Sequence, residues 1–142
     1  SLLLLLFSVQ IKKGEIIMCI FCEKYNNKND IIMENETCFV ISDERPVNYG
    51  HMLIIPKQHK KSYFDLTYKE VEDMFMLSKN CKHYLDNMLE PDGYNIGFNI
   101  GEWAGQTVDH CHMHIIPRYA GDVPATELRG GIRNFKKPIK GC

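Results

Sequence analysis

The sequence predicts an α+β fold: an antiparallel sheet of about five strands with one long and one short helix. Two observations lead to this prediction. Short segments that alternate apolar and polar residues recur along the chain, separated by loops that contain Asn, Gly or Pro. One longer segment near the middle repeats its apolar residues at helical spacing. Because short loops join most of the expected strands, we expect the strands to pair antiparallel.

The length and composition are those of one ordinary folded domain. The chain has 142 residues, of which 44% are hydrophobic and 25% charged, and this excludes a disordered or fibrous protein. Its 17 Lys and Arg nearly balance its 18 Asp and Glu, for a net charge of −1. Binding to nucleic-acid polymers or to anionic membranes needs concentrated positive charge, so neither partner is expected.

Five segments are expected to form the strands: residues 31–34, 37–41, 51–55, 94–100 and 110–116. The first two flank a tight turn at Asn35-Glu36. Pro56 and Pro117 are expected to end the third and the last, because proline lacks the backbone N–H that a sheet uses. The polar, Asn-rich residues 23–30 are expected to form a loop, and residues 101–105 a loop of small residues.

The long helix is expected from Thr67 to about Leu89. Thr67 and Glu70 have the spacing of a capping box, in which each side chain accepts a hydrogen bond from the other residue's backbone N–H. Apolar residues then recur at i, i+3 and i+4 and form one apolar face. Pro91 and Gly93 follow the helix and end it. Residues 62–66 predict the short helix, a single turn.

Residues 1–17 are expected to be a non-native or disordered leader, followed by one domain over residues 18–142. The apolar run at residues 2–7 is too short to cross a bilayer, which takes roughly 20 apolar residues. Lys12 and Lys13 follow this run, whereas a signal peptide places its positive charge first. Met18 is therefore the expected native start, and without an export signal the protein is expected to be cytoplasmic.

Five of the six cysteines fall into two kinds, and the sixth is the terminal Cys142. Cys38, Cys81 and Cys111 lie within apolar periodic segments and are expected to be buried thiols. Cys19 and Cys22 form a Cys-x-x-Cys pair, which in a reducing compartment indicates metal or redox chemistry.

Three histidines alternate along the last expected strand, at His110, His112 and His114. Side chains at i, i+2 and i+4 of a strand share one face, so three imidazoles are expected to lie side by side. Such a row fits either a catalytic zinc site or nucleophilic catalysis by a neutral imidazole on phosphorus. The polar residues of the glycine-bearing segment 99–107 favour the phosphorus chemistry, because they offer neutral donors to phosphate oxygens.

The segment His110-Cys-His-Met-His114 resembles the His-x-His-x-His signature of the histidine triad family. The similarity extends to Asn99, to Ala104-Gly105-Gln106, to Pro117-Arg118 and to residues 50–57, and it covers residues 18–124. Residues 121–124 and 130–133 are more similar to the branch that cleaves dinucleoside polyphosphates.

The resemblance implies a reaction and a role for each matching residue. The middle histidine, His112, would attack the α-phosphorus of a nucleotide and form a covalent nucleotidyl-histidine that water then hydrolyses. The His110 carbonyl would hold the His112 ring in its reactive tautomer, and His51 would support the site. The expected donors to the phosphate oxygens are His114, Gln106, Thr107 and Asn99.

The nucleoside would lie beside this row. Asp43 matches an acidic residue that accepts both ribose hydroxyls, and a carboxylate suits a vicinal diol because its two oxygens accept two donors. A solvated loop acid is the alternative. Phe21, Phe39 and Leu53 would enclose the base or would equally be core. Trp103 would contact the leaving group or only cover its loop.

The resemblance also implies a structural zinc site. Zinc in such sites is held by four Cys or His ligands, and zinc-containing members of the family use the positions of Cys19, Cys22, His59 and His110. The alternative, a thioredoxin-like redox pair, lacks the βαβ pattern that surrounds such a pair.

The expected partners are a purine nucleotide or nucleotide conjugate and a second copy of the chain, packed through the long helix and the adjoining strand. Dinucleoside polyphosphates are the first expected substrates, and nucleoside phosphoramidates such as adenylate on lysine are the second. A nucleotide-binding scaffold without turnover and a metallohydrolase remain the competing hypotheses.

Overall fold

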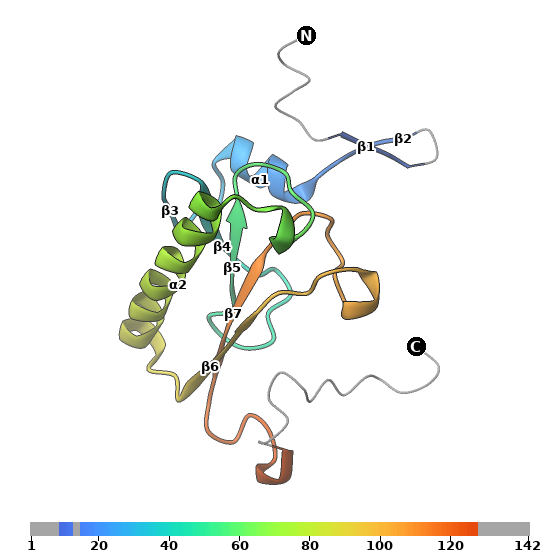
Figure 1. Ribbon diagram of the computed structural model, residues 1–142. Helices are drawn as coiled ribbons and strands as arrows, with labels where there is room; N and C mark the ends of the chain where they lie inside the picture. The colour runs from blue at the N-terminus through green and yellow to red at the C-terminus, as the bar shows by residue number, and fades with distance from the viewer. Residues whose placement is uncertain (1–8, 13–14, 128–142) are drawn as a thin grey trace.

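The computed structural model describes residues 9–12 and 15–127. Its main sheet has five strands in the order β3-β4-β5-β7-β6, and every neighbouring pair is antiparallel. The strands are β3 (Met33–Glu34), β4 (Cys38–Ser42), β5 (Met52–Pro56), β6 (Gly93–Gly97) and β7 (Met113–Arg118). The predicted α+β fold with five antiparallel strands is confirmed (Figure 1).

Helix α2 (Tyr68–Leu89) lies along one face of this sheet. The predicted capping box is present: Glu70 N–H donates to Thr67 Oγ1 over 3.1 Å, and Thr67 N–H donates to Glu70 Oε1 over 2.9 Å. The buried core between helix and sheet consists of Cys38, Val40, Met52, Ile54, Met74, Leu77, Cys81, Leu85, Met113 and Ile115. All three cysteines predicted to be buried thiols are buried.

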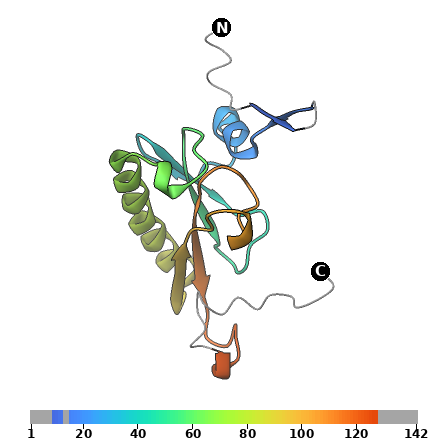
Figure 2. The same ribbon diagram turned by 45° about the vertical axis from the view of Figure 1, so that its right-hand side comes forward.

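The opposite face carries a smaller apolar cluster and the short helix α1 (Ile20–Asn27). Figure 2 shows α2 on one side of the sheet and the segment with the 3-10 helix η3 (Glu102–Ala104) on the other. The prediction of a loop over residues 23–30 was wrong, because α1 continues to Asn27. Phe21 and Cys22 are buried at the start of α1, so tertiary packing holds a polar sequence in a helix.

The predicted strand 110–116 is shifted toward its C-terminal end, because β7 begins only at Met113 and ends at Arg118. Its pairing with β5 is limited to residues 113–115, and upstream Cys111 N–H donates to Lys60 C=O instead. Beyond Ile115, β7 pairs with β6 alone among the described strands. The Pro117 carbonyl accepts from Asn48 Nδ2, so this residue's backbone faces away from β6 and no ladder hydrogen bond is broken. Strand β6 is likewise shorter than predicted and ends at Gly97.

Smaller elements complete the described chain. The predicted helical turn at 62–66 is the 3-10 helix η2 (Tyr63–Asp65), and a further 3-10 helix, η4, spans Ala125–Glu127. The backbones of β1 (Val9–Lys12) and β2 (Glu15–Met18) pair antiparallel ahead of α1. Residues 130–133, part of the resemblance to one branch of the family, lie outside the described residues. In the part of the chain that is described, no helix has the length and apolar character needed to cross a bilayer.

Candidate active site and metal site

The three histidines lie together on the sheet face opposite α2. Only His114 belongs to β7, since His110 and His112 precede the strand. The rings of His112 and His114 are 4.9 Å apart, and Phe21 packs edge-on against those of His110 and His112 at 5.8 and 5.1 Å. Met113 and Ile115 belong to the α2 core, so the expected alternation of faces is present.

A backbone carbonyl determines the tautomer of His112. Its Nδ1 lies 2.8 Å from the carbonyl oxygen of His110, which can only accept, so Nδ1 carries the proton. The electron pair of Nε2 is therefore free. Burial lowers the pKa of His112 below its usual range, which keeps the ring neutral at pH 7. His112 thus has the protonation state of a nucleophile or of a metal ligand.

A chain of hydrogen bonds orients His114. Val47 N–H donates to His51 Nδ1 over 3.0 Å, so the proton of the neutral His51 ring lies on Nε2. His51 Nε2 lies 2.9 Å from His114 Nδ1, which must then accept, and the proton of His114 lies on Nε2. Burial, followed by the neighbouring His112 and His51, lowers the pKa of His114 to about 4.

The Nε2 atom of His114 is buried and makes no hydrogen bond to any described residue. An unpaired buried donor costs free energy, so this N–H is suited to an acceptor that comes from outside the chain. It lies beside the His112 ring, and together the two rings present one electron pair and one donor. An anionic centre such as a phosphate matches that pair of groups.

Asp43 is close to the same chain of hydrogen bonds. One carboxylate oxygen, Oδ1, accepts from Arg45 N–H over 2.8 Å, and Oδ2 lies 3.3 Å from His51 Nε2. The spacing of Asp43, His51 and His114 would also suit a metal ion. The two ring nitrogens that face each other are, however, already joined by a hydrogen bond.

The segment 99–107 forms a compact loop beside the histidines. Gly101 and Gly105 both have a φ near +90°, a conformation that side chains with a Cβ rarely adopt. A Cβ on Gly105 would lie 3.7 Å from Asn99 Nδ2, so the two ends of the loop are close. The side chains of Asn99 and Thr107 make no hydrogen bond within the described residues, which leaves their donors available.

Gln106 has a different role from the one expected. Its Nε2 donates to the carbonyls of Lys61 and Val108 over 2.8 and 3.0 Å, which uses both amide hydrogens. Its Oε1 accepts from Gly101 N–H over 2.8 Å. Gln106 therefore holds the loop in place and has no donor left for a phosphate.

The residues expected around the base all belong to one buried cluster with Ile41 and Ile55. Phe39 is fully buried at 0% exposure, which fits core packing and leaves no surface for a ligand. Phe21 and Leu53 each retain 5% exposure. Trp103, by contrast, is fully exposed on η3.

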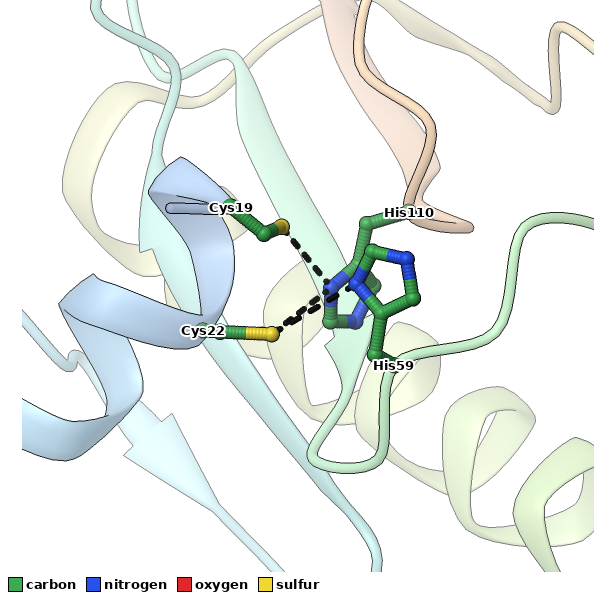
Figure 3. A group of neighbouring side chains, drawn as sticks. All are labelled: Cys19, Cys22, His59 and His110. Carbon is green, nitrogen blue, oxygen red and sulfur yellow. Dashed lines mark hydrogen bonds between the residues drawn. The ribbon is translucent and has the colours of Figure 1, made fainter. Parts of the chain in front are cut away.

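Four side chains from three distant segments converge at the end of the histidine row. Figure 3 shows Cys19 and Cys22 at the start of α1, His59 on the segment after β5, and His110, all pointing toward one another. The Sγ atoms lie 3.4 Å (Cys19 to His110 Nδ1), 3.5 Å (Cys22 to His59 Nδ1) and 3.6 Å (Cys22 to His110 Nδ1) from the ring nitrogens.

These distances fit a tetrahedral zinc site. With Zn–S of about 2.3 Å and Zn–N of about 2.0–2.1 Å, tetrahedral angles place sulfur and nitrogen ligands about 3.5 Å apart. His110 Nε2 donates to Pro56 C=O over 2.8 Å, so its Nδ1 has an electron pair available for a metal. The pKa of Cys19 is raised by its hydrogen bond with Cys22 and by burial, because two adjacent thiolates need a cation.

Several groups that position the site were not predicted. They are backbone atoms: Val47 N–H, which fixes the tautomer of His51, and the Pro56 and Lys61 carbonyls, which hold His110 and Gln106. Every residue type has a backbone N–H or carbonyl of this kind, apart from the proline N–H. No signal in a single sequence could therefore have identified them.

Comparison with known proteins places this geometry in a family. The HIT domain family model matches residues 24–121. An uncharacterised HIT-like protein of Methanocaldococcus jannaschii is 37% identical over 131 residues, 87% of this chain and 100% of the relative.

Two solved structures are also similar. A Zn-bound histidine triad family protein from Mycobacterium smegmatis is 34% identical, with a TM-score of 0.67 over 81% of this chain and 90% of its own. The diadenosine triphosphate hydrolase of Plasmodium falciparum is 32% identical, with a TM-score of 0.62 over 71% of this chain and 69% of its own.

Proposed function

The chain belongs to the HIT domain family, and on that premise we propose that it is a nucleotide hydrolase that cleaves at the α-phosphate through a covalent nucleotidyl intermediate on His112. The observation that carries the proposal is the pair of complementary groups on one face. His112 has its proton on Nδ1 and a free electron pair on Nε2, and the buried Nε2–H of His114 has no partner among the described residues.

The first step forms a bond between His112 Nε2 and the α-phosphorus. The bond from phosphorus to the bridging oxygen of an anhydride breaks, and its electron pair leaves on that oxygen as a phosphate anion. The positive charge that develops on the ring is shared with Nδ1–H, which the His110 carbonyl holds at 2.8 Å. His114 Nε2–H, Asn99 and Thr107 donate to the phosphate oxygens as charge accumulates there.

The second step regenerates the imidazole. A water oxygen bonds to the phosphorus, the N–P bond breaks, and its electron pair returns to His112 Nε2. The water's protons pass to the product phosphate and to solvent. The product is a nucleoside monophosphate.

The nucleoside would lie on the β4–β5 side of the row. Asp43 would accept the ribose hydroxyls there, which is supported by an Oδ1 with one partner among the described residues and by a long Oδ2 contact. Phe21 and Leu53 border the same face and would contact a purine.

Cys19, Cys22, His59 and His110 would hold a structural zinc ion. When bound, zinc would cross-link α1, the segment after β5 and the residue before His112, and it would supply no chemistry to the reaction. His110 is then both a ligand, through Nδ1, and the residue whose carbonyl orients the nucleophile.

Dinucleoside polyphosphates are the first candidate substrates, supported by the similarity to a diadenosine triphosphate hydrolase. Nucleoside phosphoramidates are the second, since no Lys or Arg is among the described residues that line the recess beside His114. In either case the nucleotide half of the substrate occupies the same place.

We also propose that the protein is a homodimer that pairs through α2 and β6. Among the described strands, β6 lies at the edge of the sheet with β7 as its one neighbour. Ile96 on β6 and Phe75 on α2 are 40% and 48% exposed, and they are apolar side chains that a second copy would cover. Sedimentation equilibrium would show twice the chain mass, and a monomer at all concentrations would contradict the dimer.

The decisive experiment compares wild-type protein with His112→Ala and with His83→Ala, a histidine on the exposed side of α2. Each is incubated with diadenosine triphosphate and with adenosine phosphoramidate, with and without a chelator. We expect wild type and His83→Ala to release adenosine monophosphate, chelated or not, and His112→Ala to release none. A short quench should yield protein whose mass is increased by one adenylate.

Other outcomes identify the competing functions. Binding of nucleotide without product from either substrate would indicate a scaffold. Loss of turnover on chelation, with the fold intact, would indicate a metallohydrolase.

A further inference from the structure

Three consecutive residues after β5 each contact a different part of the proposed active site. The His59 ring lies among the four candidate zinc ligands (Figure 3). The Lys60 carbonyl accepts from Cys111 N–H over 2.6 Å, and the Lys61 carbonyl accepts from Gln106 Nε2 over 2.8 Å. We call these three residues the bridging segment, because they join parts of the site that are distant from one another in the sequence.

The hydrogen bond from Cys111 is directly connected to the nucleophile. Cys111 lies between His110, whose carbonyl oxygen is 2.8 Å from His112 Nδ1, and His112 itself. Pairing of β7 with β5 begins only at Met113, so the Cys111 N–H bonds to the Lys60 carbonyl and not to a ladder partner. A shift of the bridging segment therefore changes the angle between the His110 carbonyl and the His112 ring.

The side chain of Lys60 anchors the bridging segment to helix α2. Its Nζ donates to Glu70 Oε1, the same oxygen that accepts Thr67 N–H in the capping box. The Glu70 side chain is only 5% exposed, and among the described residues no other cation pairs with its carboxylate. Such a pair adds little net stability, because both charges lose their hydration, yet it strongly disfavours any arrangement that separates them.

A second lysine–carboxylate pair on α2 leads to a different part of the molecule. Lys69 Nζ donates to Asp73 Oδ1 over 2.8 Å, and the Asp73 side chain is 3% exposed. The other Asp73 oxygen accepts from the backbone N–H and the hydroxyl of Thr37, which precedes β4. This pair also joins a lysine to a buried acid of α2, but it holds the β3–β4 turn and not the bridging segment.

We propose that Lys60 and Glu70 are positioning residues for nucleotidyl transfer, because their ion pair fixes the bridging segment that holds the backbone before His112 and the donor loop. This inference rests on the proposed function and adds to it two residues that touch no substrate. The effect passes through the Lys60 carbonyl to Cys111 and through the Lys61 carbonyl to the loop. A displacement of about 1 Å at a reacting group can lower the rate about 100-fold.

Turnover of four proteins tests the ion pair: wild type, Lys60→Met, Lys60→Arg and Lys69→Met. Each is assayed with diadenosine triphosphate and with adenosine phosphoramidate, and its thermal midpoint is measured. We expect Lys60→Met to lower kcat at least about tenfold while KM stays within about threefold, because the nucleotide contacts remain. Lys60→Arg keeps the charge pair and should recover most of kcat. Lys69→Met is the matched control, which should lower the thermal midpoint and leave kcat unchanged.

Hydrogen exchange of the Cys111 amide tests the same pair without substrate. Nuclear magnetic resonance of the full chain should show exchange at least about tenfold faster in Lys60→Met than in wild type, because local opening becomes easier. Lys69→Met should leave that exchange rate unchanged. Glu70→Gln keeps an acceptor for the helix cap and removes only the charge. It should give smaller changes of the same kind, which keeps the test valid if Lys60→Met folds poorly.

The outcomes distinguish this proposal from the one on which it rests. Normal kcat and unchanged Cys111 exchange in Lys60→Met and Glu70→Gln would overturn the positioning role and leave the nucleotidyl-histidine mechanism standing. An equal loss of kcat in Lys69→Met would overturn it too, since the effect would then be one of stability, and so would a loss of kcat without faster Cys111 exchange. No turnover and no protein adduct in wild type would overturn the proposed function itself, and exchange alone would then decide whether the ion pair fixes this backbone.

Discussion

The two faces of the sheet are built from the same strands and differ in the side chains that they bury, apolar on one face and imidazole on the other. On the α2 face, Met113 and Ile115 of β7 are fully buried in the apolar core. On the opposite face, His114 alternates with them along the same strand and carries a buried donor without a described partner. Because side chains alternate along a strand, β7 packs one set of side chains into the core and presents the other set on the histidine face. Two buried side-chain atoms of the described residues have no partner, Glu70 Oε2 and His114 Nε2. The Glu70 carboxylate already pairs with Lys60 through its other oxygen, whereas the lone donor of His114 lies beside the His112 ring and indicates where a ligand would bind.

The largest expected effect comes from truncating two adjacent residues that face opposite ways. His112→Ala should abolish turnover, by at least about a thousandfold, because it removes the nucleophile, while the thermal midpoint changes little. Met113→Ala should lower the free energy of unfolding by about 2–5 kcal/mol, because it leaves a cavity in the core. Calorimetry and single-turnover assays measure both quantities.

Equal effects of the two variants on turnover and on stability would contradict the proposed difference between the faces. A Met113→Ala protein with normal stability would place that side chain outside the core. An active His112→Ala protein would exclude His112 as the nucleophile.

The next largest effect is expected from replacing one cysteine on each face of the sheet. Cys22→Ser should reduce bound zinc from about one ion per chain to a small fraction, because it removes one of four ligands, and it should lower the thermal midpoint. Cys81→Ala, on the α2 face, should lower stability through a cavity but leave the zinc content unchanged, since Cys81 is buried in the apolar core. Elemental analysis of both purified variants makes the comparison, and equal zinc loss would contradict the assigned ligands.

The features predicted correctly from the sequence are those that residues close together in the chain determine. The capping box at Thr67 and Glu70 depends on residues three apart and is present as expected. The spacing of His112 and His114 placed both rings on one face. The start of β7 was wrong because a distant partner decides it: Lys60, 51 positions earlier, accepts the hydrogen bond from Cys111 N–H.

A partner distant in the sequence also explains why the hydrogen bonds of Gln106 differ from the expected ones. An amide on a glycine-bearing loop beside a histidine row fits a phosphate donor when only the sequence is considered. In the structure, its amide reaches the Lys61 carbonyl, 45 residues away in the chain. Helix α1 was missed similarly, because its polar sequence is held by the burial of Phe21 and Cys22 against other segments.

A third, smaller effect tests Gln106 as a positioning residue. Gln106→Ala leaves Gly101 N–H and the Lys61 and Val108 carbonyls without their partner. Each of these groups that stays buried should lower the free energy of unfolding by about 1–3 kcal/mol. We expect kcat to fall about 10–100-fold because the loop with Asn99 and Thr107 is displaced. Gln106→Glu keeps the acceptor for Gly101 and should recover part of kcat. A loss confined to KM in both variants would instead indicate direct contact with substrate.

The smallest effect is a pH dependence of stability that belongs to the histidine face alone. Burial lowers the pKa of His114 to about 4, against about 6.5 in the unfolded chain. Between these values the unfolded chain binds a proton that the folded protein does not, so the free energy of unfolding should fall as the pH is lowered from about 6.5 to 4.5. Above pH 6.5 both states are neutral and the effect is absent. Since about 1 kcal/mol lowers the midpoint by roughly 2–4 °C in a chain of this size, calorimetry should detect a fall of several degrees. His114→Gln removes one titrating group and should make this slope shallower, with His112, whose pKa burial also lowers, supplying part of what remains. Met113→Ala should instead lower the midpoint by a similar amount at every pH in that window.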